Sequence, residues 1–440
     1  MKFNTQEQQL RQLLEQIDTP KVDNLHEKVH QRLTQKSPFS KGLKMTLATC
    51  LCLFLALPVA ASTPTFQKLV YLISSEMIDA LQPINLVSED NDIRLEVLGA
   101  LNDEEQVVIY LTLQDLNGDI LDETLDIYNY TLDGVSILNI QTIDYNKETK
   151  TATLRLQGNG GKHLNGKSIR FGIQSFLTNK KFYDNMDVPL DWNELLSTTP
   201  EIITLGEHDS SGGSGLITVN DTAIQVLKPN QMDIKIPGLD FVTITNVGYV
   251  NNRLHIQTRW LEDNIDDHGY FYFTDSSNRR VNNKSWSISY GVNENNETEY
   301  GRIMTEYIFE ISPEELSTFN LHGDFVSNDT YTEGNWNVKF KLDSTTETFT
   351  QKTEIKQGST TVAEVKISPL GITLNIVGEL IPEDWQVSLI LKDGARKTLS
   401  SRTSMTIQDE TTLKFSDPTL LKLENIEAIQ INDTIIPLPE

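Results

Sequence analysis

Three stretches of this chain alternate apolar and polar residues, and this repeated period of two constrains the fold more than any other feature. They are residues 93–119, 241–278 and 362–394. Each holds two alternating runs joined by a short polar turn, followed by a strand that ends in an Asp-containing turn. Alternation places successive side chains on opposite faces of a strand, and no βαβ rhythm interrupts it. The sequence therefore predicts a mainly β chain built from antiparallel sheets.

Shorter echoes of the pattern follow the first two stretches, at residues 161–176 and 323–342. Short strands at this spacing are typical of β-sandwiches. We therefore expect three tandem immunoglobulin-like β-sandwich domains. Their predicted bounds are 84–200, 230–352 and 353–440, with a linker at 201–229 that contains the Gly/Ser-rich run 208–215.

The dipeptide Asn117-Gly118 follows the alternating run at 107–113. Asn-Gly tolerates positive φ at both positions, as a type I′ turn requires, so the sequence predicts a hairpin here. The surrounding residues 115–119, DLNGD, also suggest a calcium loop, but the rest of the EF-hand spacing is absent. A hairpin is therefore the preferred interpretation.

An apolar run at residues 45–61 separates a short basic head from a long acidic body. No charged residue lies between Lys44 and Lys68. As a helix rising about 1.5 Å per residue, the run spans roughly 26 Å, just enough to cross a hydrocarbon core. Lysines flank only its N-terminal end, so the positive-inside rule predicts a cytoplasmic head at 1–44 and an extracellular body.

A cleaved signal peptide is the alternative to a membrane anchor. Val59-Ala60-Ala61 before Ser62 satisfies the small-residue rule for signal peptidase. A signal peptide has a short leader, however, whereas more than forty residues precede this run, so we prefer the anchor. Both cysteines of the chain lie within the run, at 50 and 52, so the body has no disulfides and must rely on its hydrophobic cores.

Two amphipathic helices are predicted in the head. Apolar residues recur at helical spacing on both sides of Thr19-Pro20, which ends one helix and starts the next. Short helices cannot bury such faces alone. The faces either pair with each other or lie on the inner leaflet, or they dock on a cytoplasmic protein by the helix-in-groove mode. The candidate partner-binding residues are Leu10, Leu13, Leu14, Ile17, Leu25, Val29 and Leu33.

The second of these helices contains His26-Glu27-Lys28-Val29-His30, a match to the H-E-x-x-H zinc motif. A catalytic zinc site also needs a third protein ligand and a substrate cleft. Forty residues ahead of a membrane helix do not provide them, and Val29 belongs to the apolar stripe. The motif is therefore interpreted as coincidental, and no metal is expected.

A helix is also expected at residues 62–83, directly after the membrane run. Thr63-Pro64 is a good helix start, and Pro83 is its predicted end. Between them apolar residues keep helical spacing. They are Phe66, Leu69, Val70, Ile73, Met77 and Leu81.

The body offers little that resembles a catalytic site. Glu262-Asp263 and Asp266-Asp267-His268 form its one acidic cluster with a histidine. The cluster lacks the ligand spacing of a calcium cage, so it is expected to be a solvated loop. No G-x-S-x-G elbow, P-loop, paired-Cys zinc site or dinucleotide fingerprint occurs. We therefore expect no enzyme activity and no cofactor.

Charge narrows the choice of partners. The formal net charge is −25, and the head carries +3, which leaves −28 for the rest of the chain. So acidic a body is not expected to bind nucleic acid.

Several phrases of the body resemble a known family. The run at 72–128, LISSEMIDALQPINLVSEDNDIRLEVLGALNDEEQVVIYLTLQDLNGDILDETLDIY, is followed in order by HGYFYFTD and EGNWNVKF. Together they resemble a family of uncharacterised single-pass membrane proteins of Gram-positive bacteria, classed as a domain of unknown function. The likeness covers residues 70–345. It implies a cytoplasmic head, one membrane helix and a β-rich ectodomain, in proteins often regarded as candidate anti-sigma factors.

These features support two hypotheses for function. In the first, the chain is a membrane-anchored anti-sigma factor or envelope sensor, whose ectodomain detects an unknown extracellular ligand while the head binds a sigma factor. The head lacks the zinc-binding His and Cys pattern of the best-known anti-sigma factors. In the second, the chain is a surface-anchored or secreted structural or adhesive binding protein with no signalling role.

Overall fold

The computed structural model describes most of the body of the chain. The described residues are 69, 71–161, 163–197, 199–206, 208–212, 224–261, 265–295, 297–343, 348–357, 359–378, 385–399, 401–407, 410–417 and 419–438. Over this part of the chain no helix is long and apolar enough to cross a membrane. The predicted head at 1–44 and the apolar run at 45–61 lie outside the described residues and stay predictions.

The first module begins after the short helix α5 (Ser75–Ala80). Its strands are β1 (Gln82–Asp90), β2 (Ile93–Asn102), β3 (Val107–Asp115), β4 (Asp126–Leu132), β5 (Ile137–Asn146), β6 (Thr151–Asn159) and β7 (Ser168–Asp187). One antiparallel sheet has the order β1-β2-β3-β6-β5, and β4 pairs with β7 in a second sheet.

The second module holds two single-turn helices, α6 (Trp192–Leu195) and α7 (Pro313–Leu316). Its strands are β8 (Ile202–Thr204), β9 (Ser210–Gly212), β10 (Gln225–Leu227), β11 (Ile234–Lys235), β12 (Val242–Val250), β13 (Arg253–Trp260), β14 (His268–Thr274), β15 (Ser285–Val292), β16 (Thr298–Phe309) and β17 (Asn320–Lys341). The large sheet has the order β11-β12-β13-β16-β15-β9, β14 pairs with β17, and β8 pairs with β10.

The third module completes the described chain. Its strands are β18 (Phe349–Gln357), β19 (Thr360–Ser368), β20 (Gly371–Val377), β21 (Val387–Leu391), β22 (Arg396–Thr398), β23 (Ser401–Ile407), β24 (Glu410–Ser416), β25 (Ile426–Ile431) and β26 (Thr434–Pro437), with a 3₁₀ turn at Leu423–Asn425. The two sheets have the orders β18-β19-β20-β24-β23 and β22-β21-β25-β26.

All three modules share one strand plan. Seven strands of each module follow it, and β8–β10 of the second module and β22 and β26 of the third are additions to it. Counted in chain order among the seven, the first, second and third strands are neighbours, the sixth and fifth extend the same sheet, and the fourth and seventh pair in the other sheet. The hairpins β2–β3, β12–β13 and β19–β20 fall in the three stretches that alternate in the sequence. The prediction of a mainly β chain with antiparallel sheets is confirmed.

In each module the two sheets bury a common core. Leu95 and Leu111 of the large sheet of the first module share a cluster with Phe171 and Trp336 of its small sheet. The second and third modules have cores of the same kind. This follows from alternation, because each strand turns its apolar face toward the opposite sheet.

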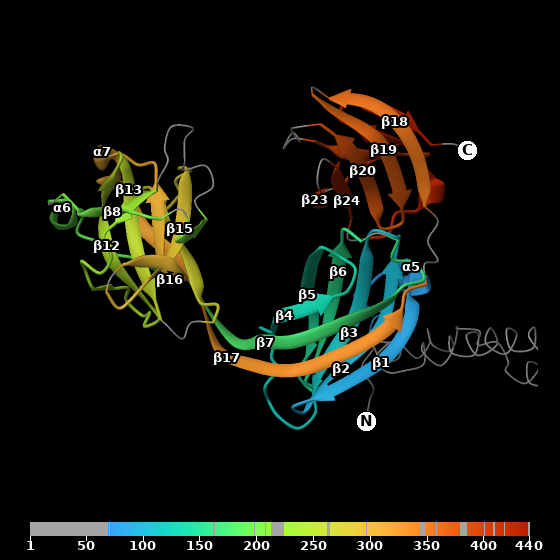
Figure 1. Ribbon diagram of the computed structural model, residues 1–440, viewed down its shortest axis with the longest axis horizontal. Coiled ribbons are helices and arrows are strands. Elements are labelled where there is room, and N and C mark those ends of the chain that lie inside the picture. The colour runs from blue at the N-terminus through green and yellow to red at the C-terminus, as the bar shows by residue number, and fades with distance from the viewer. Residues whose placement is uncertain are drawn as a thin grey trace, which may run out of the picture. The chain divides into compact units, whose positions relative to one another are not determined.

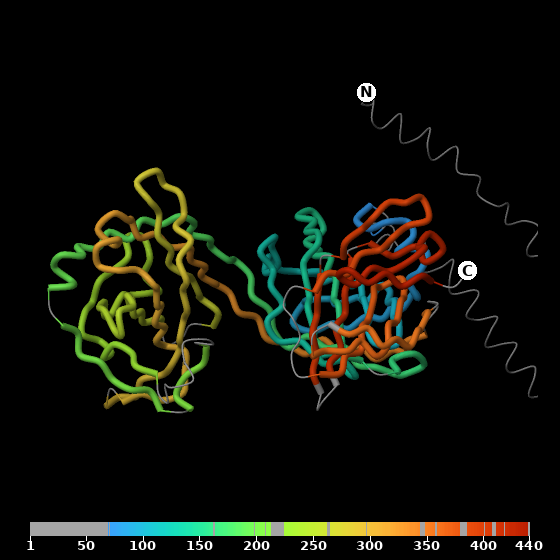
Figure 2. The backbone as a smooth tube through the Cα atoms, turned by 90° about the horizontal axis from the view of Figure 1, so that it is seen from above, coloured from blue at the N-terminus to red at the C-terminus, as the bar shows by residue number. Residues whose placement is uncertain are grey.

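Strands β7 and β17 join the first two modules as one two-stranded ribbon. They pair from His322↔Asp187 to Lys341↔Ser168, and Figure 1 shows them side by side. Figure 2 follows the same strands as a green and an orange tube. The C-terminal half of β17 thus returns to the first module, although the sequence analysis assigned 230–352 to the second domain. Trp336 is fully buried there, and its Nε1 donates to the backbone oxygen of Ile93 at 2.9 Å.

The return of β17 places the two ends of the first module next to each other. The side-chain amide of Gln82, the first residue of β1, donates to the backbone oxygen of Lys341 at 2.9 Å. Its oxygen accepts the backbone N–H of Asp343 at 2.8 Å. The chain therefore leaves for the third module beside the point where it entered the first.

The predicted linker at 201–229 contributes strands instead. Its Gly/Ser-rich part holds β9, whose residues pair with Ile288–Tyr290 at the edge of the large sheet of the second module. The strands β8 and β10 pair with each other. The unpaired edge of β15 explains the difference, because a strand edge accepts even a Ser/Gly segment through backbone hydrogen bonds alone.

The turn at Asn117-Gly118 is not a type I′ hairpin. Neither residue has positive φ, and the next strand, β4, pairs with β7 instead of β3. The Asp115 carboxyl group instead accepts the backbone N–H groups of the turn, including that of Gly118 at 2.6 Å. In the described part of the chain, the two-residue turns with positive φ at both positions are Asn91-Asp92 and Asn251-Asn252.

The helix predicted at 62–83 is interrupted where the structure describes it. Residues 69, 71 and 72 are helical, Ile73 and Ser74 are not, and the helix resumes as α5. Helix α5 starts after Ser74, whose side chain accepts the backbone N–H of Met77, and it ends at Ala80. Pro83 lies inside β1, the edge strand of its sheet, where a missing N–H is tolerated. The apolar residues that predicted one helix pack on the first module. Leu69 and Met77 are buried against the outer face of its large sheet.

Candidate functional site

The predicted partner-binding residues all precede the described part of the chain. They are Leu10, Leu13, Leu14, Ile17, Leu25, Val29 and Leu33, and the His-Glu-x-x-His motif at 26–30 precedes it as well. Their role stays a prediction.

The acidic cluster before β14 is described from Asp266 onward. The backbone oxygen of Asp266 lies 2.7 Å from Nδ1 of His268, and Asp267 accepts the backbone N–H of Asn328 at 2.7 Å. Burial raises the pKa of both aspartates above the usual value. Among the described residues no group of three His, Cys, Asp or Glu side chains is arranged to hold a metal ion. The described half of the cluster therefore orders a loop.

A cavity of about 840 Å³ lies between the first and third modules, within the compact unit Pro64–Glu440. One wall is the outer face of the sheet β18-β19-β20-β24-β23. The facing wall consists of the β2–β3 turn and the residues that follow β6. Because Val365 and Ile367 point into the core of the third module, Lys366 between them points to the cavity.

Two rows of cross-strand neighbours form the wall contributed by the third module. In the first row Thr350 pairs with Lys366, Lys366 with Thr373, and Thr373 with Lys414. The second row lies two residues further along each strand, on the same face. Its members are Lys352, Glu364, Asn375, Thr412 and Met405. This sheet face is therefore polar and rich in lysine and threonine.

The β2–β3 turn of the first module places an acidic tripeptide, Asp103-Glu104-Glu105, against the lysines. Oδ1 of Asp103 accepts the backbone N–H of Gln106 at 2.8 Å, which shapes the turn. Oδ2 of Asp103 accepts from Lys414 Nζ at 2.6 Å and also from the Ser368 hydroxyl. The Asp103 and Lys414 side chains are 1% and 9% exposed, so this ion pair is buried between the modules.

A second ion pair between the two modules, formed by Lys366 and Glu105, is more exposed than the first. Lys366 Nζ lies 2.5 Å from Glu105 Oε1 and 3.5 Å from Glu364 Oε1. Burial alone lowers the pKa of Lys366, but its hydrogen bond to Glu105 and the two negative charges outweigh that effect and raise it. The ammonium group is therefore held in its charged form.

The pKa of Asp103 reflects the same balance. Burial disfavours the charged carboxylate and by itself raises the pKa. The Lys414 charge and the hydrogen bonds from Lys414, Ser368 and Gln106 outweigh it, so the pKa lies below the usual value. The carboxylate therefore stays charged although it is buried.

Apolar contacts complete the joint between the modules. Leu370 of the third module is buried in one cluster with Met77 of α5 and with Leu101 and Tyr110 of the first module. Beside the cavity, Gly160 has a φ of +75°, and a Cβ built on it would lie 2.6 Å from Met405 Sδ. Only glycine fits this close approach without displacement.

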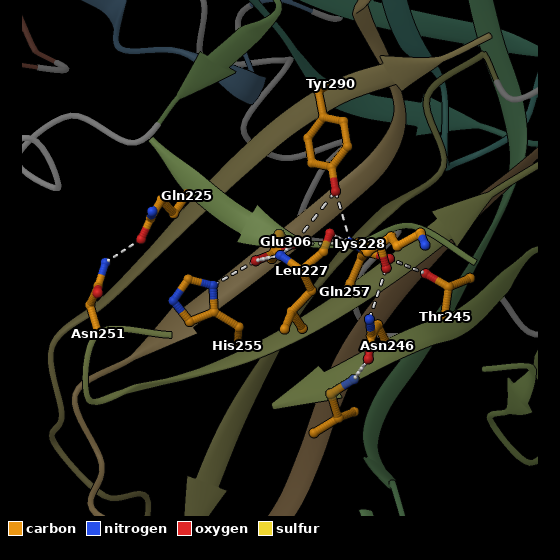
Figure 3. A network of polar contacts seen from close by, with 11 residues as sticks. Gln225, Leu227, Lys228, Thr245, Asn246, Asn251, His255, Gln257, Tyr290 and Glu306 are labelled. Atoms are coloured by element: carbon orange, nitrogen blue, oxygen red, sulfur yellow. Dashed lines mark hydrogen bonds and ion pairs between the residues drawn. The ribbon is translucent and has the colours of Figure 1, made fainter. Parts of the chain in front are cut away.

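A second polar cluster lies inside the second module (Figure 3). The carboxyl group of Glu306, which is 0% exposed, accepts the backbone N–H of Leu227 at 3.0 Å and lies 2.6 Å from Nδ1 of His255. Gln257 Nε2 is 3.1 Å from the same carboxyl group and donates to the backbone oxygen of Leu227 at 2.7 Å. It also lies 2.8 Å from the Tyr290 hydroxyl.

This Glu306 cluster is closed to solvent and its groups are paired. Its side chains satisfy the backbone N–H and C=O of Leu227 in β10, which would otherwise be buried without a partner. Thr245 donates to the remaining oxygen of Gln257 at 2.9 Å. A carboxyl group beside a histidine resembles an acid–base pair, but no reactant can reach it, so its arrangement fits a structural role.

Asp103, Lys366 and Lys414 were not predicted as site residues from the sequence. A signal for the sheet wall was present, since Glu364-x-Lys366, Thr373-x-Asn375 and Thr412-x-Lys414 place polar residues on the face opposite the core. The meeting of this face with the β2–β3 turn, more than 250 residues earlier in the chain, leaves no local pattern.

No family model and no curated protein matches the chain. Among solved structures, the conserved domain protein from Bacillus anthracis is 8% identical, with 84% of this chain and 94% of that chain covered and a TM-score of 0.21. A likeness at that TM-score carries no argument, so function has to be inferred from the residues of this chain.

Proposed function

We propose that this chain is an extracellular sensor that binds a small ligand in the cavity between its first and third modules. The cavity of about 840 Å³ is of the size that small-molecule sites occupy, and it lies where two bodies meet. Its two walls are joined by a few polar contacts around Asp103 and Lys414. The observation on which the proposal rests is the position of the cavity, which is lined by residues of both modules. A ligand that touches both walls would hold the two modules together.

Each module is further proposed to be an immunoglobulin-like β-sandwich in the broad sense of two stacked sheets. The shared cores and the seven-strand plan support it. The strand order differs from that of an immunoglobulin domain, in which the second and third strands lie in opposite sheets. Here they form a hairpin in one sheet, in all three modules.

Signalling is proposed to pass through the membrane run at 45–61 to the head, which would hold a sigma factor inactive. The charge contrast between head and body and the two amphipathic stripes support this part of the proposal. In this arrangement the ligand acts outside and the regulated partner is inside.

The proposal is tested with a transcription reporter for a paired sigma factor. Deleting residues 1–40, or combining Leu13→Asp with Leu25→Asp, should raise transcription because the apolar stripe loses its partner. Gln12→Asp, which adds one charge beside the stripe, is the matched control and should leave transcription unchanged. Unchanged transcription in every variant would refute signalling and favour the structural or adhesive alternative.

A separate measurement tests the anchor. The mature protein should fractionate with membranes and retain its head. A mature N-terminus at Ser62 on a protein released into the medium would exclude the signalling role.

A further inference from the structure

Three buried polar atoms at the inter-module cavity have no hydrogen-bond partner among the residues that the structure describes. They are Gln106 Oε1, Asn159 Oδ1 and Thr373 Oγ1, and all three residues line the cavity. Their exposed fractions are 2%, 6% and 1%. A buried polar group without a partner costs about 1 to 3 kcal/mol, so a site that retains three of them is suited to a molecule that supplies the missing contacts.

The three atoms come from both walls. Val107 pairs with Gly158, so Gln106 and Asn159 are the next residues at the same end of β3 and β6. Thr373 lies across the cavity, in the first row of the wall contributed by the third module, where it pairs with Lys366 on one side and Lys414 on the other. A ligand bonded to all three would therefore bridge the first and third modules.

The chemistry of the atoms indicates the class of ligand. The amide oxygens of Gln106 and Asn159 only accept hydrogen bonds, so the ligand must donate. The ammonium groups of Lys366 and Lys414 are already paired with carboxylates. An anion at Lys366 or Lys414 would have to break those pairs. An anion at Lys352, the third lysine of the lining, would share the cavity with the carboxyl groups of Asp103, Glu104, Glu105 and Glu364, so the lining as a whole disfavours phosphate or carboxylate ligands.

Resting on the proposed sensor function, we infer that the cavity takes an uncharged small molecule rich in hydrogen-bond donors, and that this ligand closes the first module onto the third. Amide N–H groups and sugar hydroxyl groups share this donor chemistry.

The test is calorimetric titration of the full-length protein at neutral pH with three probes. N-acetyl-dialanine amide supplies uncharged amide donors, trehalose supplies hydroxyl donors, and citrate is the anionic comparison. Binding of either uncharged probe without binding of citrate supports the inference, and the probe that binds distinguishes the two sources. Binding of citrate alone, or of no probe, overturns it.

Variants locate the binding. Gln106→Met and Thr373→Val remove one partner from each wall and should each weaken binding about tenfold. Gln141→Met, on the exposed surface of β5, is the matched control and should bind like the parent. Equal affinity in all three variants overturns the assignment of the site.

Closure is read from amide hydrogen exchange. The backbone N–H of Gln106, which bonds to Asp103 in the β2–β3 turn, should exchange more slowly when a probe is bound. A crystal structure with probe that shows only ordered waters on the three atoms would overturn the inference. Probe binding that leaves the reporter unchanged would refute the sensor function but not the ligand class.

Discussion

Glu306 and Asp103 are both buried acidic residues, but they lie in different surroundings. Glu306 lies inside the second module, where strands β10, β13 and β16 surround it and its neighbours are paired. Asp103 lies between two modules, and the cavity beside it retains unpaired polar atoms. Burial therefore does not distinguish a structural group from one at a candidate binding site, whereas the completeness of hydrogen bonding around it does.

The two residues also differ in how water can reach them when a neighbouring side chain is replaced. The Glu306 cluster cannot reach water without unfolding the second module. The Asp103 turn can reach water if the first and third modules separate. Variants of the two residues should therefore affect different processes, global unfolding in one case and opening of the joint in the other.

The largest effect is expected for Glu306→Ala. The change leaves the Leu227 N–H and the Gln257 amide without their acceptor in a sealed interior, and it opens a void. We expect a loss of about 3 to 5 kcal/mol in the free energy of unfolding of the second module, measured by urea denaturation. Glu299→Ala, on the exposed part of β16, is the matched control and should change stability by less than about 0.5 kcal/mol. A small loss for Glu306→Ala would show that the cluster is not structural.

Lys414→Met should have a smaller effect. We expect it to lower the free energy needed to separate the first and third modules by about 2 kcal/mol. It leaves the Asp103 carboxylate without its ammonium partner, and the turn can respond by moving into water. Hydrogen exchange of the Gln106 N–H should therefore speed up, while exchange in the strands of the second module stays constant.

The double variant Asp103→Asn with Lys414→Met tests whether the two residues act as a pair. The free energy lost by the double variant should be smaller than the sum of the losses of the two single variants, because no uncompensated charge is left buried. Additive losses would argue against a direct ion pair.

A smaller effect is expected from pH. The folded pKa of Asp103 lies below its unfolded value of about 3.8. The carboxylate therefore stabilises the joint fully above that pH, and the contribution is lost as the pH falls through the folded pKa. The difference in unfolding free energy between the parent and Asp103→Asn should shrink below pH 4, as measured by denaturation at pH 7 and pH 3. A difference that does not change with pH would contradict this assignment.

The smallest effect is expected for Tyr290→Phe. Burial and the neighbouring Glu306 charge raise the pKa of Tyr290, so its hydroxyl stays protonated. The variant removes one contact to Gln257, whose amide still reaches Leu227 and Glu306. We expect a loss of about 1 kcal/mol, measured by urea denaturation. A loss as large as that of Glu306→Ala would mean that the hydroxyl organises the cluster.

The strands could be read from the sequence because alternation is a local signal. The hairpins β2–β3, β12–β13 and β19–β20 lie where apolar and polar residues alternate, as Leu111 and Leu113 do with Thr112 and Gln114 in β3. A different local rule, the preference of Asn-Gly for a type I′ turn, failed at Asn117-Gly118, because the Asp115 side chain accepts the hydrogen bonds of the turn and the chain crosses to the other sheet.

The candidate site could not be read in the same way. Asp103 looks like any residue of an acidic turn, and Lys414 like any polar residue of an alternating strand. Their meeting depends on the return of β17 to the first module, which brings the start of the third module with it. Pairing of strands that are far apart in sequence carries no local signature, so neither the joint nor its cavity was predicted.

The Gln82 side chain bonds the start of β1 to the end of β17. A pulling force applied between the residues that precede β1 and the C-terminal residues would therefore enter and leave the first module at almost the same place. The chain reaches the second module along β7 and leaves it along β17. The second module would therefore carry no tension while the hydrogen bonds of Gln82 to Lys341 and Asp343 hold. When the protein is stretched, the hydrogen bond between Gln82 and Lys341 should break first, and force should act on the second module only after that.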